Sequence, residues 1–447
     1  MIKLNSFIKK MVAVFFLSII SLIIILGNIE NGILLTILSF VVIYFFVKKV
    51  KIKKFAIFLV CFSLITKIIS VSVLDIPLRG DYYLMYYGSL DVLNGDLTFI
   101  NGPYFSDFGY QLFNVFYQAL VLKFFGNAFI LKLLNCIYST VITVLIYLFA
   151  RKISTEDSAR IVSLLYTISL YPLYLNSILG NQQLSLMFIL LAVYIVLCKK
   201  NKFWYLVLAG FLLGLGNLER AEGIVYIFTI FAYLFLTSSN LVEVVKKFCP
   251  VVITYVLVCF LASFIMIAFN INKIGFKNNN PYWKVVCGLN YKYSGKFNYE
   301  DEVAYIHSKD AELEVIKDRF SDFKTLPGLF YRKIKVQFLY DDLDQTFNVN
   351  NTKQFSKDIV SIIINYIKSI NIFVLLILLI GQLKKQKKSN IELFFLINLV
   401  IYFVVYLLIE VNARYYYNPQ VAVIILATLG VDVLLKKLDN LKLKKYA

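Results

Sequence analysis

The chain has 447 residues, of which 60% are hydrophobic and only 16% are charged, and its mean hydropathy is +0.74. Soluble domains are about half apolar and about a quarter charged, so this composition excludes a soluble globular protein. The formal net charge of +19 does not indicate nucleic-acid binding, because the basic residues lie in short connections between apolar runs.

Apolar runs of membrane-spanning length recur along the chain. They predict an all-α polytopic membrane protein with about twelve transmembrane helices. The first run follows Lys9 and Lys10 and lacks a small-x-small cleavage site, so we expect a retained span and not a signal peptide. The expected spans are residues 11–29, 32–47, 55–74, 128–149, 159–178, 184–198, 203–218, 223–237, 249–271, 361–380, 391–409 and 416–435.

The basic residues orient these spans. The short connections on one side carry 25 Lys and Arg residues, whereas the opposite short connections carry only Arg79, Arg220 and Arg414. Because Lys and Arg are retained in the cytoplasm, we expect both termini there, in a multi-pass protein of the cell membrane. The basic side can also contact anionic membrane lipids.

Four segments follow from this pattern. Residues 1–74 form a three-span segment, and residues 75–271 hold an acidic outer loop and the core transmembrane module. Residues 272–360 form an extracytoplasmic segment, and residues 361–447 form a second three-span segment. Within the extracytoplasmic segment, "YEDEVAYIHSKDAELEVIKDRF" predicts one charged surface helix, "CGLNYKYSGKFN" a loop, and Pro327 the start of another helix.

The stretch "LRGDYYLMYYGSLDVLNGD" places several acids and tyrosines just beyond the third expected span. One interpretation is an ordinary acidic outer loop whose tyrosines form an interfacial belt. The other concerns Asp81, which precedes an aromatic pair at the start of a helical pattern. A carboxylate at a helix N-terminus is stabilised in its charged form, and it could act as a general base or hold a cation.

The stretch "GYQLFNVFYQALVLKFFG" is apolar, but it is not counted as a span. If it crossed the membrane, every later Lys-rich connection would lie outside. Gln111, Asn114 and Gln118 recur at spacings of three and four, which places them on one helix face. We therefore expect an interfacial or re-entrant helix at the outer surface.

The sequence predicts no disulfide framework and no His/Cys metal cluster. Five of the six cysteines lie in or beside expected spans, and only Cys287 lies in the expected outer segment. His307 is the only histidine in the chain.

The order of these pieces resembles the polytopic glycosyltransferases of the GT-C superfamily. The resemblance is carried by the Asp81 stretch, by "GYQLFNVFYQALVLKFFGN", and by three later stretches, "AGFLLGLGNLERAEGIV", "GLNYKYSGKFNYEDE" and "EVNARYYYNPQVAVIILA". It is similar in particular to family 39-like bacterial proteins, the group of the protein O-mannosyltransferases and the aminoarabinose transferase. The resemblance covers most of the chain from about residue 55.

The resemblance implies roles for the outer-loop residues. Asp81 stands where the family has an acid that serves as the base or accompanies a metal. Apart from the resemblance, Tyr82 and Tyr83 beside it are candidate substrate contacts, whose rings could hold the loop at the interface or stack on a sugar. Where the family often has a second acid, this chain has Asn181, Gln182 and Gln183, whose amides could hydrogen-bond a sugar hydroxyl but cannot act as a base. A divalent metal ion is therefore left open as a cofactor.

Two arginines are candidate phosphate contacts. Arg220 lies between Glu219 and Glu222, which fits either a local Arg–Glu pair or a contact with a lipid phosphate. Arg414 stands before Tyr415 at an expected membrane edge, where its guanidinium could bind a phosphate with two donors. Its alternative is an interfacial Arg–Glu anchor with Glu410.

The resemblance implies an integral membrane glycosyltransferase. It would move a sugar from a polyprenyl-phosphate donor to a glycan or protein acceptor of the cell envelope, at the outer face, with Asp81 as general base. The alternatives are a transporter or flippase, or a polymerase, for lipid-linked glycans. A transporter more often shows paired halves or broken helices at mid-membrane, and the sequence indicates neither.

Overall fold

The computed structural model describes residues 30–74, 76–199, 202–306, 308–340, 357–384 and 389–446. Within these ranges the chain is helical, and the one strand-like contact is an isolated antiparallel bridge between Phe108 and Asn278. The expected span at residues 11–29 and His307 lie outside the described residues.

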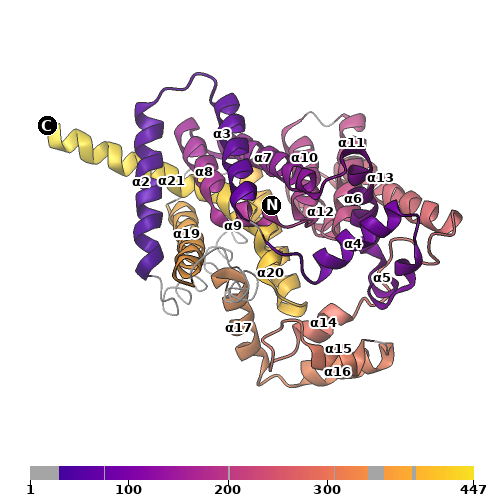
Figure 1. The fold of residues 1–447 in the computed structure, drawn as a ribbon. Coiled ribbons are helices and arrows are strands. Elements are labelled where there is room, and N and C mark those ends of the chain that lie inside the picture. The colour runs from indigo at the N-terminus through magenta and orange to yellow at the C-terminus, as the bar shows by residue number, and fades with distance from the viewer. Residues whose placement is uncertain are drawn as a thin grey trace. The chain divides into compact units, whose positions relative to one another are not determined.

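The described elements follow one another in Figure 1 from indigo to yellow. They are α2 (Glu30–Lys49), α3 (Phe55–Val73), α4 (Asp81–Leu93), η1 (Thr98–Asn101), α5 (Pro103–Asp107), η2 (Gly109–Gln111), α6 (Leu112–Phe125), α7 (Ala128–Ile153), α8 (Glu156–Ile168), α9 (Leu170–Ser177), α10 (Gln182–Cys198), α11 (Phe203–Glu219), α12 (Gly223–Thr237), α13 (Leu241–Ala268), α14 (Trp283–Gly288), α15 (Tyr299–Tyr305), α16 (Lys309–Ser321), α17 (Leu326–Leu339), α19 (Lys357–Leu383), α20 (Asn390–Leu408), η3 (Ala413–Tyr416) and α21 (Tyr417–Tyr446).

The chain divides into two compact units. The first unit contains residues 51–149 and 166–279, and the second contains the described residues up to 50, residues 150–165 and the chain from residue 280 onward. Each unit is therefore built from segments that are far apart in the sequence.

Six described helices are long and apolar enough to cross a membrane, and a seventh crossing is possible if one bent helix pair is a single span. The all-α polytopic class is thus confirmed, whereas the count of twelve spans stays a prediction. The six helices are α2, α3, α7, α13, α19 and α20.

The expected continuous span at residues 159–178 is wrong, because the structure divides it between α8 and α9. Ser169 has an extended backbone (φ −65°, ψ 122°) and separates the two helices. Pro172 lies in the first turn of α9, where its missing N–H needs no partner within the helix. After α9 the chain bends by 119° into α10, so this part of the first unit is a broken span or a re-entrant loop.

Helix α13 starts earlier than the expected span at residues 249–271. The side chain of Asn240 accepts a hydrogen bond from the backbone N–H of Glu243 at 2.9 Å and caps the helix. Lys247 then pairs with Glu243 one turn earlier, at 2.6 Å. The lysines that were expected in a connection therefore lie inside the first turns of α13.

Glycines allow the central helices of the first unit to approach closely. Helix α11 packs against α10 and α13. A Cβ atom at Gly210 would lie 2.3 Å from the carbonyl oxygen of Val251, and one at Gly214 would lie 2.7 Å from the Val258 side chain. The spacing of four residues places both glycines on one face, as in the small-residue interfaces of membrane helices.

A buried lysine lies in the membrane-span candidate α3. Lys67 has no exposed surface, and its Nζ donates to the hydroxyls of Ser63 at 2.6 Å and Thr143 at 2.7 Å. Its Nζ also lies 5.9 Å from the centre of the Tyr166 ring. Two hydroxyls and an aromatic face thus surround a cation that belongs to an otherwise apolar helix.

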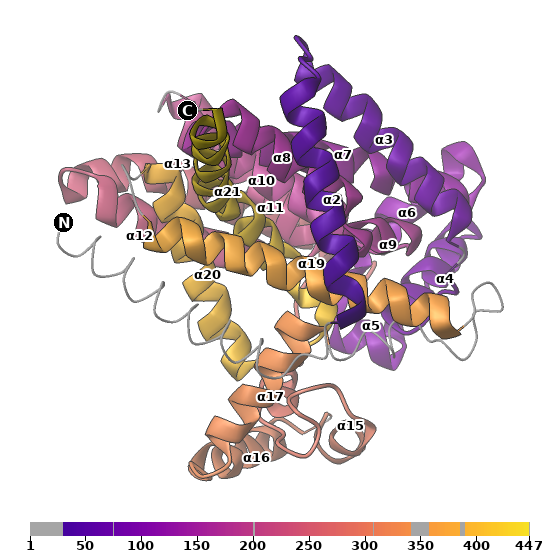
Figure 2. The same ribbon diagram turned by 90° about the vertical axis from the view of Figure 1, so that its left-hand side faces the viewer.

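The second unit has its own glycine contact. Helix α19 packs against both α2 and α21, and Figure 2 shows α19 passing beside α2. A Cβ atom at Gly430 would lie 1.8 Å from the carbonyl oxygen of Ile377, so α21 approaches α19 through its backbone.

Helices α14 to α17 of the second unit form a small subdomain at the lower end of Figures 1 and 2. Pro327 lies in the first turn of α17, as the sequence predicts. The single charged helix expected around residues 299–320 is instead two helices, α15 and α16. Cys287 was expected in a wet segment, but it is fully buried in α14.

A bidentate ion pair holds this subdomain together. Arg319 donates to both carboxylate oxygens of Asp301, at 2.7 and 2.9 Å, and the amides of Asn290 and Asn298 donate to the same carboxylate. Burial alone would raise the pKa of Asp301, but these donors outweigh it and lower the pKa below its ordinary value.

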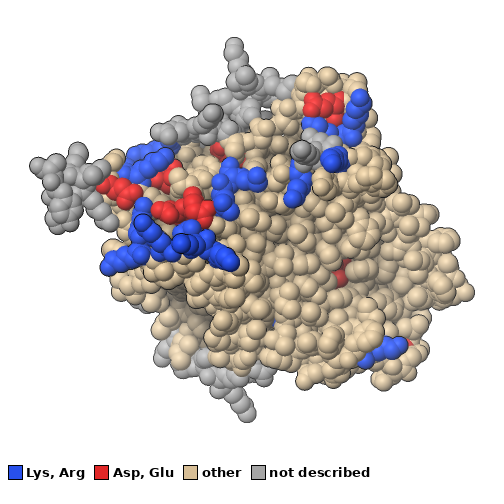
Figure 3. Space-filling view, turned by 90° about the horizontal axis from the view of Figure 1, so that it is seen from above, with Lys and Arg blue, Asp and Glu red and all other residues tan. Residues whose placement is uncertain are grey.

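The opposite end of the second unit carries a charged cluster. In Figure 1, α2 runs upward from the subdomain side, so its last turn with Lys48 lies at the upper end. Lys48 pairs with Asp157 and Asp439, at 3.2 Å each, and Glu156 pairs with Arg151 and Arg160. Figure 3 views the molecule from this side and shows Lys and Arg gathered with Asp and Glu in patches.

Candidate functional site

Asp81 begins helix α4, as the sequence predicts. Gly80 precedes it as the cap residue with a φ of +51°, a left-handed conformation that glycine adopts without strain. The carboxylate therefore lies in the first turn, where the helix dipole stabilises its charge. Asp81 is partly exposed, and α4 packs against α6 in the first unit.

The two candidate tyrosines that follow Asp81 point to different surroundings. The hydroxyl of Tyr82 accepts a hydrogen bond of 2.5 Å from the amide of Gln182, so the structure brings these two predicted residues together. Tyr83 is 45% exposed, and its ring lies against that of Tyr87 with centroids 4.2 Å apart. Of these two tyrosines, Tyr82 is the one that bonds to the start of α10, just after the bend between α9 and α10.

The polar face of the helix at 109–126 points into the protein. Gln111, Asn114 and Gln118 are all buried. The amide of Gln118 donates to the Asn114 side chain at 2.6 Å, and the amide of Asn114 donates to the Glu219 carboxylate. Helix α6 has 14 residues, too few for the span candidates above. The amides of Asn114 and Gln118 thus donate to protein groups inside the first unit, whereas the side-chain oxygen of Gln118 has no partner among the described residues.

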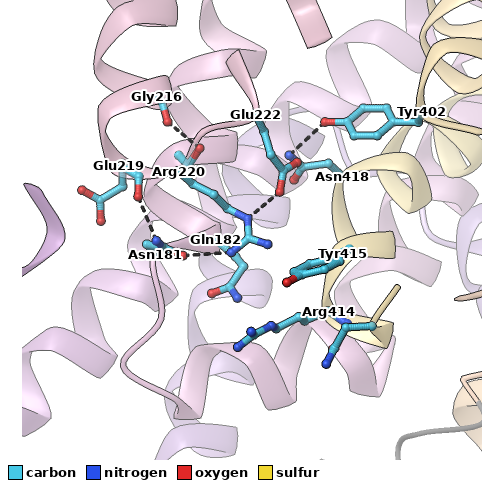
Figure 4. Close-up of polar contacts among 12 residues, drawn as sticks. Asn181, Gln182, Gly216, Glu219, Arg220, Glu222, Tyr402, Arg414, Tyr415 and Asn418 are labelled. Atoms are coloured by element: carbon cyan, nitrogen blue, oxygen red, sulfur yellow. Dashed lines mark hydrogen bonds and ion pairs between the residues drawn. The ribbon is translucent and has the colours of Figure 1, made fainter. Parts of the chain in front are cut away.

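Asn181 connects three segments of the first unit. Its amide donates to the backbone oxygen of Glu219 at 2.8 Å and to Gln111 at 3.3 Å, and its oxygen accepts from Arg220 at 3.2 Å. Figure 4 shows Asn181 between Glu219 and Arg220. We refer to these bonded residues together as the Asn181 cluster: Gln111, Asn114, Gln118, Asn181, Glu219, Arg220 and Glu222.

The acids on either side of Arg220 have different surroundings. Arg220 forms an ion pair with Glu222, so the local Arg–Glu pair is confirmed. Glu219 has no exposed surface, and only one of its carboxylate oxygens has a hydrogen-bond partner among the described residues. A fully buried carboxyl on an apolar helix is costly, which marks the end of α11 as a specialised position.

Gln183 does not join the Asn181 cluster. It is fully buried, and its amide donates to the side chain of Asn176 at 3.1 Å, across the chain break between α9 and α10. Of the two glutamines predicted to contact substrate, only Gln182 reaches an outer-loop residue, Tyr82.

Arg414 and Tyr415 lie in η3 of the second unit. The Tyr415 hydroxyl donates to the Glu410 carboxylate at 3.3 Å. The Arg414 guanidinium and the Lys284 ammonium lie 5.5 and 5.1 Å from the centre of the Tyr415 ring. Two cations therefore share one aromatic ring, an arrangement that suits an anionic ligand.

The chain that leads to η3 is held by backbone contacts. We call residues 409–416 the Glu410 loop. The N–H of Glu410 donates to the oxygen of Lys284 at 2.6 Å, and the N–H of Val411 donates to the oxygen of Gly295 at 2.8 Å. The helical subdomain α14–α17 thus supports the loop that carries Arg414.

Lys333 of α17 makes three hydrogen bonds at the base of this loop. Its Nζ donates to the backbone oxygens of Gly288, Leu407 and Ile409, each at 2.8 Å. Lys333 is 1% exposed. Burial lowers the pKa of Lys333 to about 7, and the charge of Glu410 acts in the opposite direction.

Sequence reasoning named most residues of both regions, including buried ones such as Asn114 and Glu219, but it could not predict which partners the buried ones bond to, and it missed Lys333. The bond between Asn114 and Glu219 and the contacts of Lys333 depend on tertiary structure. Among the described residues, no three His, Cys, Asp or Glu side chains gather as ligands for a metal ion. Two sequence signals could have pointed to these buried contacts: Glu219 at the end of the apolar helix α11, and Lys333 in the aromatic-rich helix α17.

Comparison with known proteins gives one family match. Residues 112–266 match the sequence profile of the family described as dolichyl-phosphate-mannose-protein mannosyltransferase. This range runs from α6 to α13 and contains Asn114, Asn181, Glu219 and Arg220. The match confirms the predicted resemblance to GT-C membrane glycosyltransferases.

One solved structure is similar over most of the chain. The archaeal oligosaccharyltransferase AglB from Archaeoglobus fulgidus, in complex with an inhibitory peptide and a dolichol-phosphate, aligns with a TM-score of 0.49 and 15% identity. The alignment covers 88% of this chain and 52% of that chain, so this chain spans about half the length of that protein. No curated protein matches the sequence.

Proposed function

We propose that this protein is a membrane glycosyltransferase that moves a sugar from a polyprenyl-phosphate donor to an acceptor of the cell envelope. The family match at residues 112–266 carries this proposal, because it includes the buried Asn114, Asn181 and Glu219 of the Asn181 cluster. The proposed partners are the lipid-linked sugar, membrane lipids, and a glycan or protein acceptor.

In the proposed reaction, Asp81 takes the proton of the acceptor hydroxyl, and the oxygen attacks the anomeric carbon of the sugar. The bond between that carbon and the phosphate oxygen breaks, so polyprenyl phosphate leaves and the anomeric configuration inverts. The leaving phosphate gains charge, which arginine side chains can stabilise. Arg414 is the proposed contact, with Arg220 as a second one. Tyr82 and Gln182, bonded to one another, would contact the sugar.

The proposed orientation places the α14–α17 subdomain outside the cell and both termini in the cytoplasm. Its support is that the subdomain and the charged cluster around Lys48 lie at opposite ends of the second unit. A thiol introduced at the exposed Ser308 should react with an impermeant reagent in intact cells. Reaction only after lysis would exclude this orientation and, with it, Asp81 as an outer-face base.

The test of the reaction is sugar transfer by Asp81→Asn. The amide keeps the size of the carboxyl group but cannot accept the acceptor proton, so the rate should fall by on the order of 10²–10⁴. The assay supplies a panel of radiolabelled polyprenyl-phosphate hexoses and pentoses to membranes containing matched amounts of protein.

Asp91→Asn is the matched control, because Asp91 lies on the same helix, α4, outside the proposed chemistry. It should transfer sugar at close to the wild-type rate. Near-normal transfer by Asp81→Asn would show that Asp81 is not the base. No transfer by the wild-type protein from any donor in the panel would remove the proposed donor class.

The bent pair α9 and α10 favours a second candidate, a transporter or flippase of lipid-linked glycans. Broken helices form the binding sites of many transporters, whereas the sequence predicts two full spans joined by a short turn at residues 179–183. Movement of a fluorescent lipid-linked glycan across proteoliposome membranes, without sugar transfer, would establish this function in place of the first.

A further inference from the structure

We propose that Lys333 is a positioning residue, whose ammonium holds the Glu410 loop so that Arg414 and Tyr415 can bind the phosphate of a polyprenyl-phosphate ligand. This inference rests on the proposed function and adds a residue that lies outside the family match at 112–266. It concerns the second unit alone.

The contacts of Lys333 use every N–H that an ammonium has. A protonated lysine carries three donors and no acceptor, and Lys333 donates three bonds of 2.8 Å to backbone oxygens. Two acceptors, Leu407 and Ile409, are at the C-terminal end of α20. Carbonyls at a helix C-terminus have no partner within the helix and attract a cation. Lys333 therefore ends α20 and fixes where the Glu410 loop begins.

The third acceptor connects the C-terminal end of α20 to helix α14. Gly288, whose oxygen receives the third bond, is the last residue of that helix. A Cβ atom on Gly288 would lie 2.3 Å from the backbone of Leu408 and Ile409, so the two segments meet main chain to main chain. Lys284 precedes Gly288 by one turn in α14 and places its ammonium over the Tyr415 ring.

The stem of Lys333 is also enclosed. Gly295 has a φ of +73°, and a Cβ atom there would lie 2.8 Å from the Lys333 side chain. The oxygen of Gly295 accepts the N–H of Val411. Gly295 thus contacts both the Lys333 side chain and Val411 of the Glu410 loop. A displaced Lys333 would therefore also disturb the hydrogen bond between Gly295 and Val411. Side-chain placement errors of about 1 Å can cost on the order of 10²-fold in rate.

The test measures binding of polyprenyl phosphate to the full chain in lipid nanodiscs. Lys333→Met keeps an unbranched stem but has no donor, and we expect it to weaken binding on the order of 10-fold. Arg414→Ala should weaken it at least as much. If Lys333 acts through the loop, adding Lys333→Met to Arg414→Ala should cause little further loss. Lys333→Arg retains a charge and N–H donors, so it should recover part of the affinity.

Lys335→Met is the matched control, since Lys335 lies on α17, is partly exposed and contacts the ring of Tyr331. It should bind like the wild type. Independent losses from Lys333→Met and Arg414→Ala, or wild-type binding by Lys333→Met, would overturn the proposal.

A second measurement needs no ligand. The N–H groups of Glu410 and Val411 should exchange with deuterium faster in Lys333→Met, because their partners lie in the segments that Lys333 fixes. If that variant does not fold, Gly295→Ala makes the same test by displacing the stem. Unchanged exchange would overturn the positioning role. Faster exchange in a protein whose wild type binds no polyprenyl phosphate would instead overturn the proposed donor and leave the loop contact established.

Discussion

The Asn181 cluster and the Glu410 loop each present an arginine, but they hold it by different means. In the Asn181 cluster, buried side chains bond to one another and Arg220 is paired with Glu222. In the Glu410 loop, the contacts are mainly between backbone groups, with Lys333 as the connecting side chain. The first arrangement depends on particular side chains and the second on the course of the chain, so different substitutions should disrupt them.

Among changes to these two regions, the largest effect should come from removing Glu219 of the Asn181 cluster. Glu219→Ala leaves the amide of Asn114 without its acceptor, in a region where Asn181 is also buried. An unsatisfied buried donor costs about 1–3 kcal/mol. We expect sugar transfer to fall on the order of 10²-fold as the turn before α10 shifts. Transfer is measured with matched protein levels.

Glu219→Gln is the control, since its side-chain oxygen can accept the same bond from Asn114. It should retain most of the transfer activity. An equal loss in both variants would mean that the charge of Glu219 is needed, and not only its hydrogen bond.

The next effect concerns stability, and it tests the helix packing of each unit separately. Gly430→Ala would place a Cβ atom 1.8 Å from the oxygen of Ile377, and Gly210→Ala would place one 2.3 Å from that of Val251. Because both contacts are with backbone, neither can yield cheaply, and each change should cost about 1–3 kcal/mol or more. Proteolysis during heating should cut the second unit first in Gly430→Ala and the first unit first in Gly210→Ala. The same cleavage order in both variants would contradict the expectation that each glycine stabilises only its own unit.

A smaller effect, on the stability of the α14–α17 subdomain, should appear only at acidic pH. Donors from Arg319 lower the pKa of Asp301 against the effect of burial. A depressed carboxyl pKa contributes stability above its unfolded value of 3.8, and this stability is lost as the pH falls below that value. The protection of amides in α15 and α16 against deuterium exchange, measured relative to the intrinsic exchange rate at each pH, should therefore decrease between pH 5 and pH 3. In Asp301→Asn this protection should already be lower at pH 5 and change less with pH. Protection in the wild type that does not change with pH would contradict the assignment.

The smallest effect should come from the contact between Tyr82 and Gln182. Tyr82→Phe removes one hydrogen bond of about 0.5–1.5 kcal/mol, so the donor KM should rise roughly 2- to 10-fold. Tyr83→Phe is the control because Tyr83 is exposed and packs on Tyr87. Equal effects in both variants would show that the bond to Gln182 has no special role.

The sequence predicted what periodicity and charge can encode. Helix α4 with Asp81 at its start, the polar face of α6 and the helix start at Pro327 all follow from local spacing. These features depend on residues within about two helical turns, which is the range that sequence patterns describe.

The rest depends on contacts between distant segments. The apolar run at 159–178 predicts one continuous span because hydrophobicity is unbroken across Ser169, although Pro172 is a local signal for the start of α9. The inward direction of Asn114 and Gln118 depends on Glu219, about a hundred residues later. For Lys333, the acceptors are main-chain oxygens, which every residue has, so no residue type identifies them.

The buried Lys67 has a consequence for how the protein enters the membrane. A lysine near the centre of a span costs about 2.5–3.5 kcal/mol during insertion. Its partner Thr143 belongs to α7, which is made some seventy residues after α3. We expect α3 to insert less completely in a chain truncated before α7 than in the same truncated chain with Lys67→Leu. Glycosylation mapping would measure the inserted fraction of each. The hydroxyl of Thr143 that stabilises Lys67 in the finished protein thus makes the insertion of α3 depend on a helix that has not yet been synthesised.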